Sequence, residues 1–323
     1  MRYFLIMNPA SKGGKSKRKF KDIFEALDAK NMCYDYKMTS NLDDAYKFSV
    51  EANKNKYGII VAVGGDGTIN RVINGFYDDS GKKISNAKLG VIYTGTSPDF
   101  CKSYQIPLTI DKAVDTLLSG KSKIIQIGKI KHCPSFYDEF DGRPLSDYNG
   151  TAKVSFFACC ANIGIGPVLA KTANEGIRKA AGDKAGTFIS LIKSLLNYES
   201  SEFTIRIGKK EEVIKNVYNI SVGITPFIAS GIKIKTDLRF SDRQFYNLII
   251  KNIRLYNWAG IFKKIYSGQK IINDNYTTLK YAGCIEVYGC SKNPELEFDG
   301  DSNGFLPCEI KIAHDSLEVL IDV

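Results

Sequence analysis

The sequence is poor in the residues that build metal and disulfide scaffolds. Its 323 residues include two histidines, one tryptophan and eight cysteines, and no CxxC motif occurs. Zinc-finger and disulfide-stapled secreted scaffolds are therefore not expected, and we predict reduced thiols in a cytoplasmic protein. No apolar run reaches the about 18 residues that a membrane-spanning helix needs. The five-residue apolar run near the N-terminus is too short for a signal peptide and predicts a first strand.

The composition is that of a globular protein, with 44% hydrophobic and 25% charged residues. Lysine and arginine outnumber aspartate and glutamate by 45 to 35, which gives a net charge of +10. A basic balance favours anionic partners, such as nucleic acid, nucleotide phosphate or acidic lipid, without choosing among them. Most basic residues are lysines and no RNP-like motif occurs, so nucleic acid is not expected as a partner.

The pattern of apolar and polar residues changes near residue 128. Residues 1–128 alternate apolar strand segments with amphipathic helical segments, which predicts a doubly wound α/β domain around a parallel sheet. Residues 129–323 consist mainly of short alternating segments separated by turn residues, which predicts an all-β domain, a sandwich or a barrel. We therefore expect two domains, and the residues from about 306 to 323 are a candidate for packing back onto the first.

The strongest chemical signal is the segment VAVGGDGTINRVINGF, Val61–Phe76. Gly64, Gly65 and Gly67 follow a buried strand and open a helix, where bare backbone N–H groups and the helix dipole can bind phosphate. Thr68 can cap the helix or contact phosphate. The negative charge of Asp66 opposes phosphate unless Mg²⁺ lies between them. The alternative is a glycine-rich turn without a ligand; no GK[ST] follows, so the loop is not a P-loop.

A second glycine-containing loop, NPASKGGKS, follows the first expected strand. Ligands of open α/β sheets bind at the carboxyl ends of strands, so Ser11, Gly13 and Gly14 can offer donors to phosphate, although a plain turn is the alternative. Basic residues then follow without an acidic residue before Asp22. This run, Lys12–Lys21, either attracts an anionic headgroup or is a solvated helix face.

Two further segments carry acidic residues next to glycine. The segment LGVIYTGTSPDF, Leu89–Phe100, ends a third expected strand with Thr96 and Asp99. The segment FDGD, Phe298–Asp301, lies late in the chain. Taken alone, an Asp-Gly-Asp sequence is most often a turn.

Together, NPASKGG, GGDGTINRVINGF, LGVIYTGTSPDF with Ile106-Pro107, and the late DGD resemble the diacylglycerol kinase catalytic-domain family, in order and spacing over essentially the whole chain. That family includes bacterial soluble diacylglycerol kinases, YegS-like lipid kinases and the related sphingosine kinases. The resemblance implies an N-terminal nucleotide-binding α/β domain and a C-terminal β-sandwich, with the active site in the cleft between them. It also implies ATP and Mg²⁺ as cofactors and a lipid hydroxyl at a membrane surface as acceptor, with diacylglycerol as the leading candidate.

The resemblance assigns roles to matching residues. Nucleotide phosphates and the metal network would be held by Gly64, Gly65, Asp66, Gly67 and Thr68. Asn8 and Ser11 would line the same site, and Thr96 would help to bind the nucleotide. Asp66 and Asp99 would be metal ligands, and Asp301 would take the proton of the acceptor hydroxyl.

The sequence departs from the family pattern at several positions. Pro98 and Lys102 replace a usual Asn and a frequent Arg, and Asp301 replaces the Glu of a DGE motif. The segment from Asp237 to Asp242 lacks the glycine of the family's DxxxDDG pattern, so a structural metal site is not expected there.

Two other functions remain open. A NAD kinase shares GGDGT, although the NPxSG and Asp-Phe features speak against it. A nucleotide- or lipid-binding protein without transfer activity would fit the shortened Asp301 side chain, because a misplaced base can slow a reaction by about 100-fold. A homodimer is also kept open. The expected helices around 170–181 and 187–198 could cover an acyl chain, although such apolar faces usually pack into the core.

Overall fold

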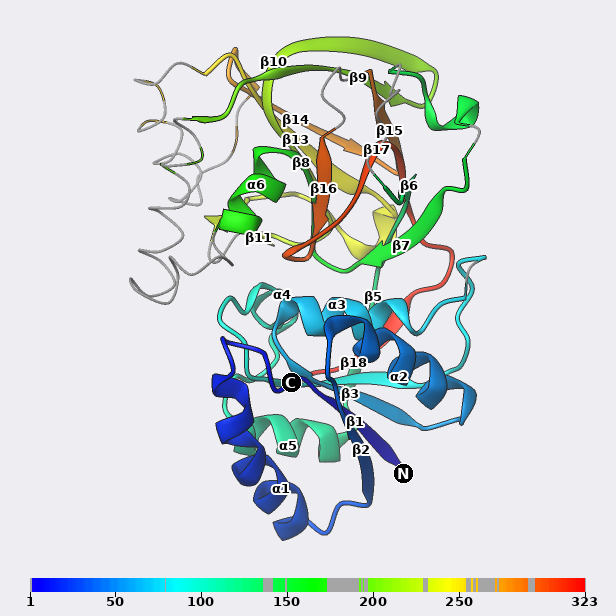
Figure 1. Cartoon of the computed structure of the whole chain (residues 1–323), viewed down its shortest axis with the longest axis vertical. Helices are drawn as coiled ribbons and strands as arrows, with labels where there is room; N and C mark the ends of the chain where they lie inside the picture. Colours follow the sequence, from blue (N-terminus) through cyan, green and yellow to red (C-terminus); the bar gives the residue numbers. More distant parts are fainter. Residues whose placement is uncertain are drawn as a thin grey trace. The chain divides into compact units, whose positions relative to one another are not determined.

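The computed structural model describes residues 2–78, 80–135, 142–148, 150–172, 197–228, 232–253, 273–289 and 294–322, with the single residues 192, 194, 257, 260 and 271. It divides the chain into two compact units (Figure 1). The first comprises Met1–Ile127 and Ala313–Val323, and the second Gly128–Ile312. Each unit is built around its own sheet and its own core.

The first unit is built on a six-stranded sheet of order β2-β1-β3-β4-β18-β5. Its strands are β1 Tyr3–Met7, β2 Tyr34–Met38, β3 Ile59–Gly64, β4 Lys88–Tyr93, β5 Ser122–Ile125 and β18 Leu317–Leu320. All neighbouring pairs are parallel except β18 and β5. The last strand of the chain thus lies inside the sheet of the first unit.

Helices cover both faces of this sheet (Figure 1). They are η1 Lys15–Lys19 (a 3-10 helix), α1 Phe20–Ala29, α2 Leu42–Lys54, α3 Asp66–Asn74, α4 Asp99–Tyr104 and α5 Ile110–Ser119. Helices α1 and α5 share a core with β1, β3 and β4, and α2 packs against α3 on the opposite face. Strand β3 is buried at every position because it is covered on both sides, as its unbroken apolar sequence predicts.

The second unit is an antiparallel β domain. Its strands are β6 Gly128–Cys133, β7 Lys153–Phe157, β8 Cys160–Gly164, β9 Ser201–Ile207, β10 Lys210–Gly223, β11 Phe227–Ile228, β12 Ile232–Lys233, β13 Phe245–Lys251, β14 Thr277–Ala282, β15 Cys284–Tyr288, β16 Glu295–Phe298 and β17 Asp301–Ile312. Its helical segments are η2 Leu145–Asp147, α6 Ile165–Thr172 and η4 Phe240–Asp242. The long strand β10 pairs with β9 through its first half and with β8 and β13 through its second half.

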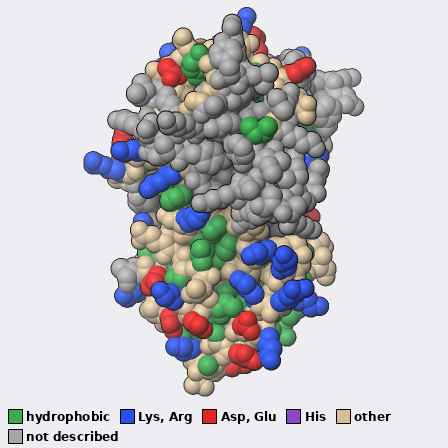
Figure 2. Space-filling view, turned by 90° about the vertical axis from the view of Figure 1, so that its left-hand side faces the viewer, with side chains coloured by type: hydrophobic (Ala, Val, Ile, Leu, Met, Phe, Trp, Pro, Cys, Tyr) green, Lys and Arg blue, Asp and Glu red, His purple; other side chains and the backbone are tan. Residues whose placement is uncertain are grey.

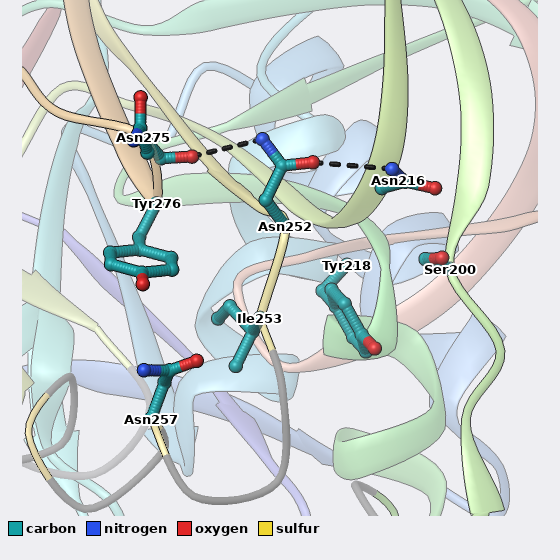
Figure 3. Close-up of a pocket in the computed structure, with 8 residues that line it drawn as sticks. All are labelled: Ser200, Asn216, Tyr218, Asn252, Ile253, Asn257, Asn275 and Tyr276. Carbon is teal, nitrogen blue, oxygen red and sulfur yellow. Dashed lines mark hydrogen bonds between the residues drawn. The ribbon is translucent and has the colours of Figure 1, made fainter.

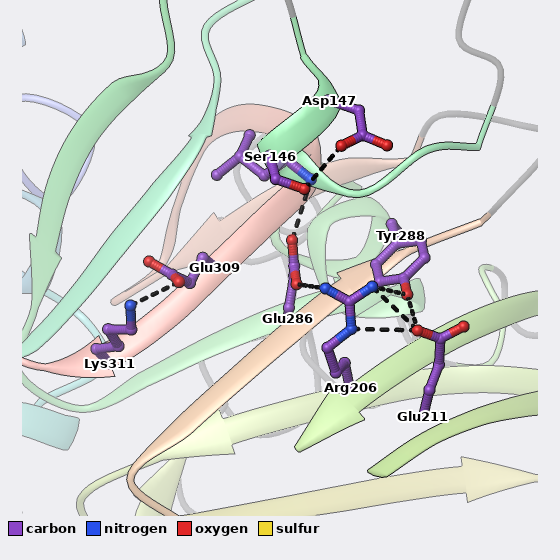
Figure 4. Close-up of polar contacts among 9 residues, drawn as sticks. Ser146, Asp147, Arg206, Glu211, Glu286, Tyr288, Glu309 and Lys311 are labelled. Carbon is purple, nitrogen blue, oxygen red and sulfur yellow. Dashed lines mark hydrogen bonds and ion pairs between the residues drawn. The ribbon is translucent and has the colours of Figure 1, made fainter. Parts of the chain in front are cut away.

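The main apolar core of this second unit has members on most of its larger strands, among them Phe157, Phe203, Phe245 and Phe298, and smaller apolar clusters lie around Ile165 and Tyr246. Outside the core, Arg206 on β9 joins neighbouring strands (Figure 4). Its guanidinium donates to Glu286 at 2.9 Å and to Glu211 at 3.0 Å. Arg206 thus contacts both strands that pair with β9, namely β15 on one edge and β10 on the other.

The predicted fold class is confirmed: a mostly parallel sheet with helices comes first, and an antiparallel β domain follows. Local boundaries differ in two places. The spacing of Phe20, Ile23, Phe24 and Leu27 predicts a helix over 15–30, but α1 starts at Phe20 after the 3-10 helix, because residues 15–19 offer only Ser16 to the core. The apolar segment KIIQIGKI, residues 123–130, predicts one strand, but the structure has two, β5 and β6, because residues 126–127 carry the chain from one sheet to the other. The helices expected around 170–181 and 187–198 lie largely outside the described residues.

Candidate active site

The candidate residues of the first unit gather at the carboxyl ends of three neighbouring strands. Asn8 follows β1, the segment from Gly64 to Thr68 ends β3 and begins α3, and Thr96 and Asp99 follow β4. Because β1, β3 and β4 are adjacent and parallel, these three loops emerge at one edge of the sheet.

Asn8 ties the first loop to the second. Its backbone N–H donates to the Val63 carbonyl at 2.9 Å, and its side-chain amide donates to the Thr68 hydroxyl at 2.9 Å. The carbonyl oxygen of the same side chain accepts from the Ala10 N–H at 3.0 Å. Thr68 is buried, so its hydroxyl is oriented by Asn8 and does not depend on solvent. Asn8 therefore aligns the start of α3 with the end of β1.

Two glycines let the loops approach each other. A β-carbon on Gly65 would lie 3.2 Å from the Gly95 α-carbon and 3.4 Å from the Ser11 hydroxyl, so all three loops meet here. A β-carbon on Gly64 would overlap the Thr68 side chain. Protein packing thus explains why glycine stands at Gly64 and Gly65.

Gly67 is different, because a β-carbon there would meet no heavy atom within 4 Å. Its backbone is half-buried at the N-terminus of α3, where the N–H groups of the first turn have no partner within the helix. Packing within the protein does not require glycine at this position. The arrangement leaves room for a ligand to approach the backbone of the first turn of α3.

The two residues expected as metal ligands are joined by a hydrogen bond. Asp66 is the first residue of α3, and its carboxylate accepts the backbone N–H of Asp99 at 3.0 Å. Asp99 is 8% exposed and begins α4. Burial, together with the charge of Asp66, raises the pKa of the nearby Cys101 thiol, so this cysteine stays protonated. The pair Asp66 and Asp99 is therefore a concentrated negative charge between two loops.

One contact at this edge was missed by sequence reasoning. The hydroxyls of Ser16 and Thr94 are hydrogen-bonded at 2.6 Å, and both residues are buried. Thr94 also donates its N–H to the Gly64 carbonyl at 2.9 Å. The only signal in the sequence was the position of Thr94 directly after an apolar strand. Thr96, which the resemblance implicates in nucleotide binding, is half-buried in the same loop.

Asp301, the expected base, belongs to the second unit, where it begins β17 and is half-buried. The neighbouring Asp299 has a structural role: its carboxylate accepts the backbone N–H groups of Ala158 at 2.7 Å, Cys159 at 2.8 Å and Cys160 at 3.1 Å. These contacts fasten the turn between β16 and β17 to the β7–β8 connection. Asp299 is thus committed to the backbone, whereas Asp301 begins β17 at the end of the same turn.

The two carboxylates of the first unit could bind Mg²⁺ only together with further ligands, such as nucleotide phosphates and water. Among the residues that the structure describes, no cluster of three or more His, Cys, Asp or Glu side chains is placed to hold a metal ion. Asp66 and Asp99 supply two carboxylates, and Mg²⁺ is commonly bound by one or two carboxylates plus substrate phosphates and water. In the segment 237–242, the Asp242 carboxylate accepts the Arg239 N–H instead, within a local turn.

The second unit contains a cavity of about 670 Å³ (Figure 3). It is lined by Ser200, Asn216, Tyr218, Asn252, Ile253, Asn257, Asn275 and Tyr276. Asn216 donates to the Asn252 side chain at 3.2 Å, which itself donates to the Asn275 carbonyl at 3.0 Å. These asparagines join the middle of β10 to the end of β13 and the start of β14. No named lining residue is ionisable except the two tyrosines.

Comparison with known proteins gives one consistent result. Residues 2–130 match the model of the diacylglycerol kinase catalytic domain. A diacylglycerol kinase of Staphylococcus aureus is 34% identical over 40% of this chain and 39% of its own length. A diacylglycerol kinase of Staphylococcus carnosus is 24% identical over 98% of this chain and 93% of its own. A crystal structure of a diacylglycerol kinase from Bacillus anthracis has the same fold, with a TM-score of 0.65, 18% identity and coverage of 99% and 97% of the two chains.

The matched domain and these relatives identify the chain as an enzyme of the lipid kinase class. Residues 2–130 thus contain a domain that matches the diacylglycerol kinase catalytic-domain family. The resemblance stated from its motifs is thereby confirmed. None of the described helices is long and apolar enough to cross a membrane.

Proposed function

We propose that the chain transfers the γ-phosphoryl group of ATP to a lipid hydroxyl, with diacylglycerol as the preferred acceptor. The observation that carries the proposal is the meeting of Asn8, the Gly64–Thr68 segment and Asp99 at one edge of the first sheet, in a chain that contains this catalytic domain. ATP phosphates would approach the first turn of α3, where Gly67 leaves its backbone accessible.

Asp66 and Asp99 would hold Mg²⁺ together with the phosphates. When bound there, Mg²⁺ neutralises negative charge on the transferring group. Asn8 and Thr68 keep the first turn of α3 in place, so its N–H groups are already oriented before the nucleotide arrives. Asp301 would accept the proton of the acceptor hydroxyl. Positioning contributes more than basicity, because the transition state of phosphoryl transfer is loose.

The test is a turnover assay with labelled ATP and Mg²⁺ across diacylglycerol, a sphingoid base, ceramide and NAD. We expect phosphorylated diacylglycerol, and Asp66→Ala should lower turnover by at least about 1,000-fold with an unchanged far-ultraviolet spectrum. Asp111→Asn is the matched control, since Asp111 is an exposed acidic residue in the first turn of α5. Turnover of NAD alone, or full activity of Asp66→Ala, would overturn the proposal.

We also propose that the lipid is reached by electrostatic docking on anionic membranes. Lys12, Lys15, Lys17, Arg18 and Lys21 are exposed in the loop after β1, in η1 and at the start of α1. Figure 2 shows Lys and Arg side chains on the displayed face of the first unit, together with Asp and Glu side chains. Each lysine near an anionic surface contributes about 1 kcal/mol, an attraction that salt screens.

Vesicle co-sedimentation tests this docking. The triple variant Lys12→Glu, Lys15→Glu, Lys17→Glu should bind anionic vesicles at least about tenfold more weakly. Lys47→Glu, Lys54→Glu, Lys82→Glu changes the same charge at exposed positions elsewhere in the first unit and should have a smaller effect. Equal binding of the protein to neutral and anionic vesicles would contradict the electrostatic account.

A further inference from the structure

A row of polar side chains crosses three neighbouring strands of the second unit. Glu297 on β16 lies opposite Asn162 on β8, which lies opposite Ser221 on β10. Glu297 is 6% exposed and Ser221 is 2% exposed. A buried polar row of this kind is retained in a β domain only when its members satisfy each other.

The row forms one continuous hydrogen-bonded chain. Asn162 donates to one oxygen of the Glu297 carboxylate at 2.6 Å and accepts from the Ser221 hydroxyl at 2.6 Å. Asn219 donates to the Ser221 hydroxyl at 2.8 Å, and its own oxygen accepts the Gly166 N–H in α6 at 2.9 Å. The chain therefore leads from the first turn of α6 to the carboxylate of Glu297.

The other oxygen of Glu297 holds the turn that carries Asp301. It accepts the backbone N–H of Gly300 at 2.5 Å. This turn has a left-handed backbone, with φ of 53° at Asp299 and 90° at Gly300. Such a conformation at a non-glycine residue persists only where the surroundings hold it. Glu297 fixes the turn from one side, and Asp299 fixes it from the other.

Burial and hydrogen bonding act on the pKa of Glu297 in opposite directions. Burial raises its pKa to about 7, against the two hydrogen bonds that favour the ionised form, and the charges of Asp299 and Asp301 raise it further. Two further ionisable residues lie on elements that flank Glu297: Cys160 on β8, whose thiol is 3.8 Å from the Asn162 side-chain oxygen, and Lys171, which is exposed on α6, a helix that packs against β16. Ionised Glu297 accepts from both donors, whereas a proton would place an O–H against Gly300 or Asn162.

We propose that Glu297 is a positioning residue, whose ionised carboxylate locks the Asp299–Gly300 turn and thereby fixes Asp301 for the acceptor. The role of Asp301 in this inference rests on the proposed function. The lock, meaning the hold of Glu297 on the Asp299–Gly300 turn, rests on the hydrogen bonds alone. It gives Asp301 a firm position although its side chain is one methylene shorter than glutamate. Misplacement of a reacting group by about 1 Å can slow a reaction by about 100-fold, so the lock matters for turnover.

The first experiment needs no substrate. In the full-length protein, the Glu297 carboxyl carbon and the Gly300 amide are followed by NMR from pH 5 to pH 9. We expect one glutamate carboxyl to titrate near pH 7, to disappear in Glu297→Gln and to be retained in Glu295→Gln, a control on the same strand. The Gly300 amide shift should follow the same midpoint. A Gly300 amide that is constant through this range would overturn the lock.

The second experiment measures turnover on the lipid identified above. At pH 8, Glu297→Gln should lower kcat by about tenfold with an unchanged KM for ATP, because the nucleotide site lies on other residues. Between pH 8 and pH 6, kcat of the wild type and of Glu295→Gln should fall by an additional factor of about five that Glu297→Gln lacks, because the carboxyl group changes from mostly ionised to mostly protonated over this range. Identical pH profiles of Glu297→Gln and Glu295→Gln would overturn the positioning role. If no lipid is phosphorylated at all, the proposed function fails, and the NMR titration still decides the lock.

Discussion

The side-chain amide of Asn8 donates to the hydroxyl of Thr68 at 2.9 Å, across 60 residues of sequence. Asn8 belongs to the loop after β1, and Thr68 to the first turn of α3. The bond joins the two loops that face the proposed phosphate site. It places the N-terminus of α3 relative to the sheet through two uncharged side chains.

Removal of this pair should affect stability and nucleotide binding together. Asn8→Ala leaves the buried Thr68 hydroxyl without its donor, which should lower the free energy of unfolding by about 1–3 kcal/mol. The KM for ATP should rise as the first turn of α3 loses its alignment. Urea unfolding and steady-state kinetics measure the two effects. Asn53→Ala, which removes a buried asparagine of α2 remote from the loops, should destabilise the fold with no change in KM.

Alanine at two glycines of the same loop should have opposite consequences. Gly67→Ala places its methyl group in open space within a helix, so stability should be unchanged or rise by up to about 1 kcal/mol, while ATP binding is lost. Gly64→Ala overlaps the Thr68 side chain and should destabilise by about 1–3 kcal/mol. Thermal unfolding with and without ATP separates them. Normal ATP affinity of Gly67→Ala would refute the phosphate site on α3.

Asp301 and Asp299 should respond differently to amide substitution. Asp301→Asn removes the proposed base and should lose most turnover at unchanged stability. Asp299→Asn disturbs a carboxylate that accepts three backbone N–H groups, so it should lower the melting temperature as well as turnover. Asp301→Glu tests whether the shorter arm limits the rate. If Asp301→Asn keeps full activity, the base has been assigned to the wrong residue.

His132 should make the fold sensitive to acid. It lies on β6 with no exposed surface, its ring contacts the Ser155 hydroxyl at 3.1 Å, and burial lowers its pKa to about 4. The unfolded chain binds this proton near pH 6.5, so stability is full above that pH and falls between pH 6.5 and pH 4 by about 3 kcal/mol.

The test compares urea unfolding of the wild type and His132→Gln at each pH. The difference between them should shrink or reverse on acidification, since the glutamine does not titrate. His314→Gln is the control, because the His314 side chain is 93% exposed. A wild-type-minus-variant difference that is independent of pH would show that His132 does not contribute to acid sensitivity.

The sequence alone determined the fold class and the family. The unbroken apolar segment before GGDGT predicted a strand covered on both sides, and β3 is buried throughout. The change in the apolar and polar pattern near residue 128 reflects a change from helices packed on a parallel sheet to antiparallel strands, since side-chain periodicity follows local geometry. The motif residues Asn8, Asp66 and Asp99 were also recognisable, because each follows or begins an element with a clear pattern.

Only the tertiary structure decided which side chains touch. No local pattern connects Ser16 with Thr94, or Glu297 with Asn162 and Ser221, because these contacts join strands and loops far apart in sequence. The local pattern alone does not separate Asp299 from Asp301, because both flank one glycine. The choice of Asp301 as the base rested on the family resemblance, and the folded turn adds that the Asp299 carboxylate binds three backbone amides. Hydrogen-bond partners and burial, which set the role and the pKa of a carboxylate, are properties of the packed chain.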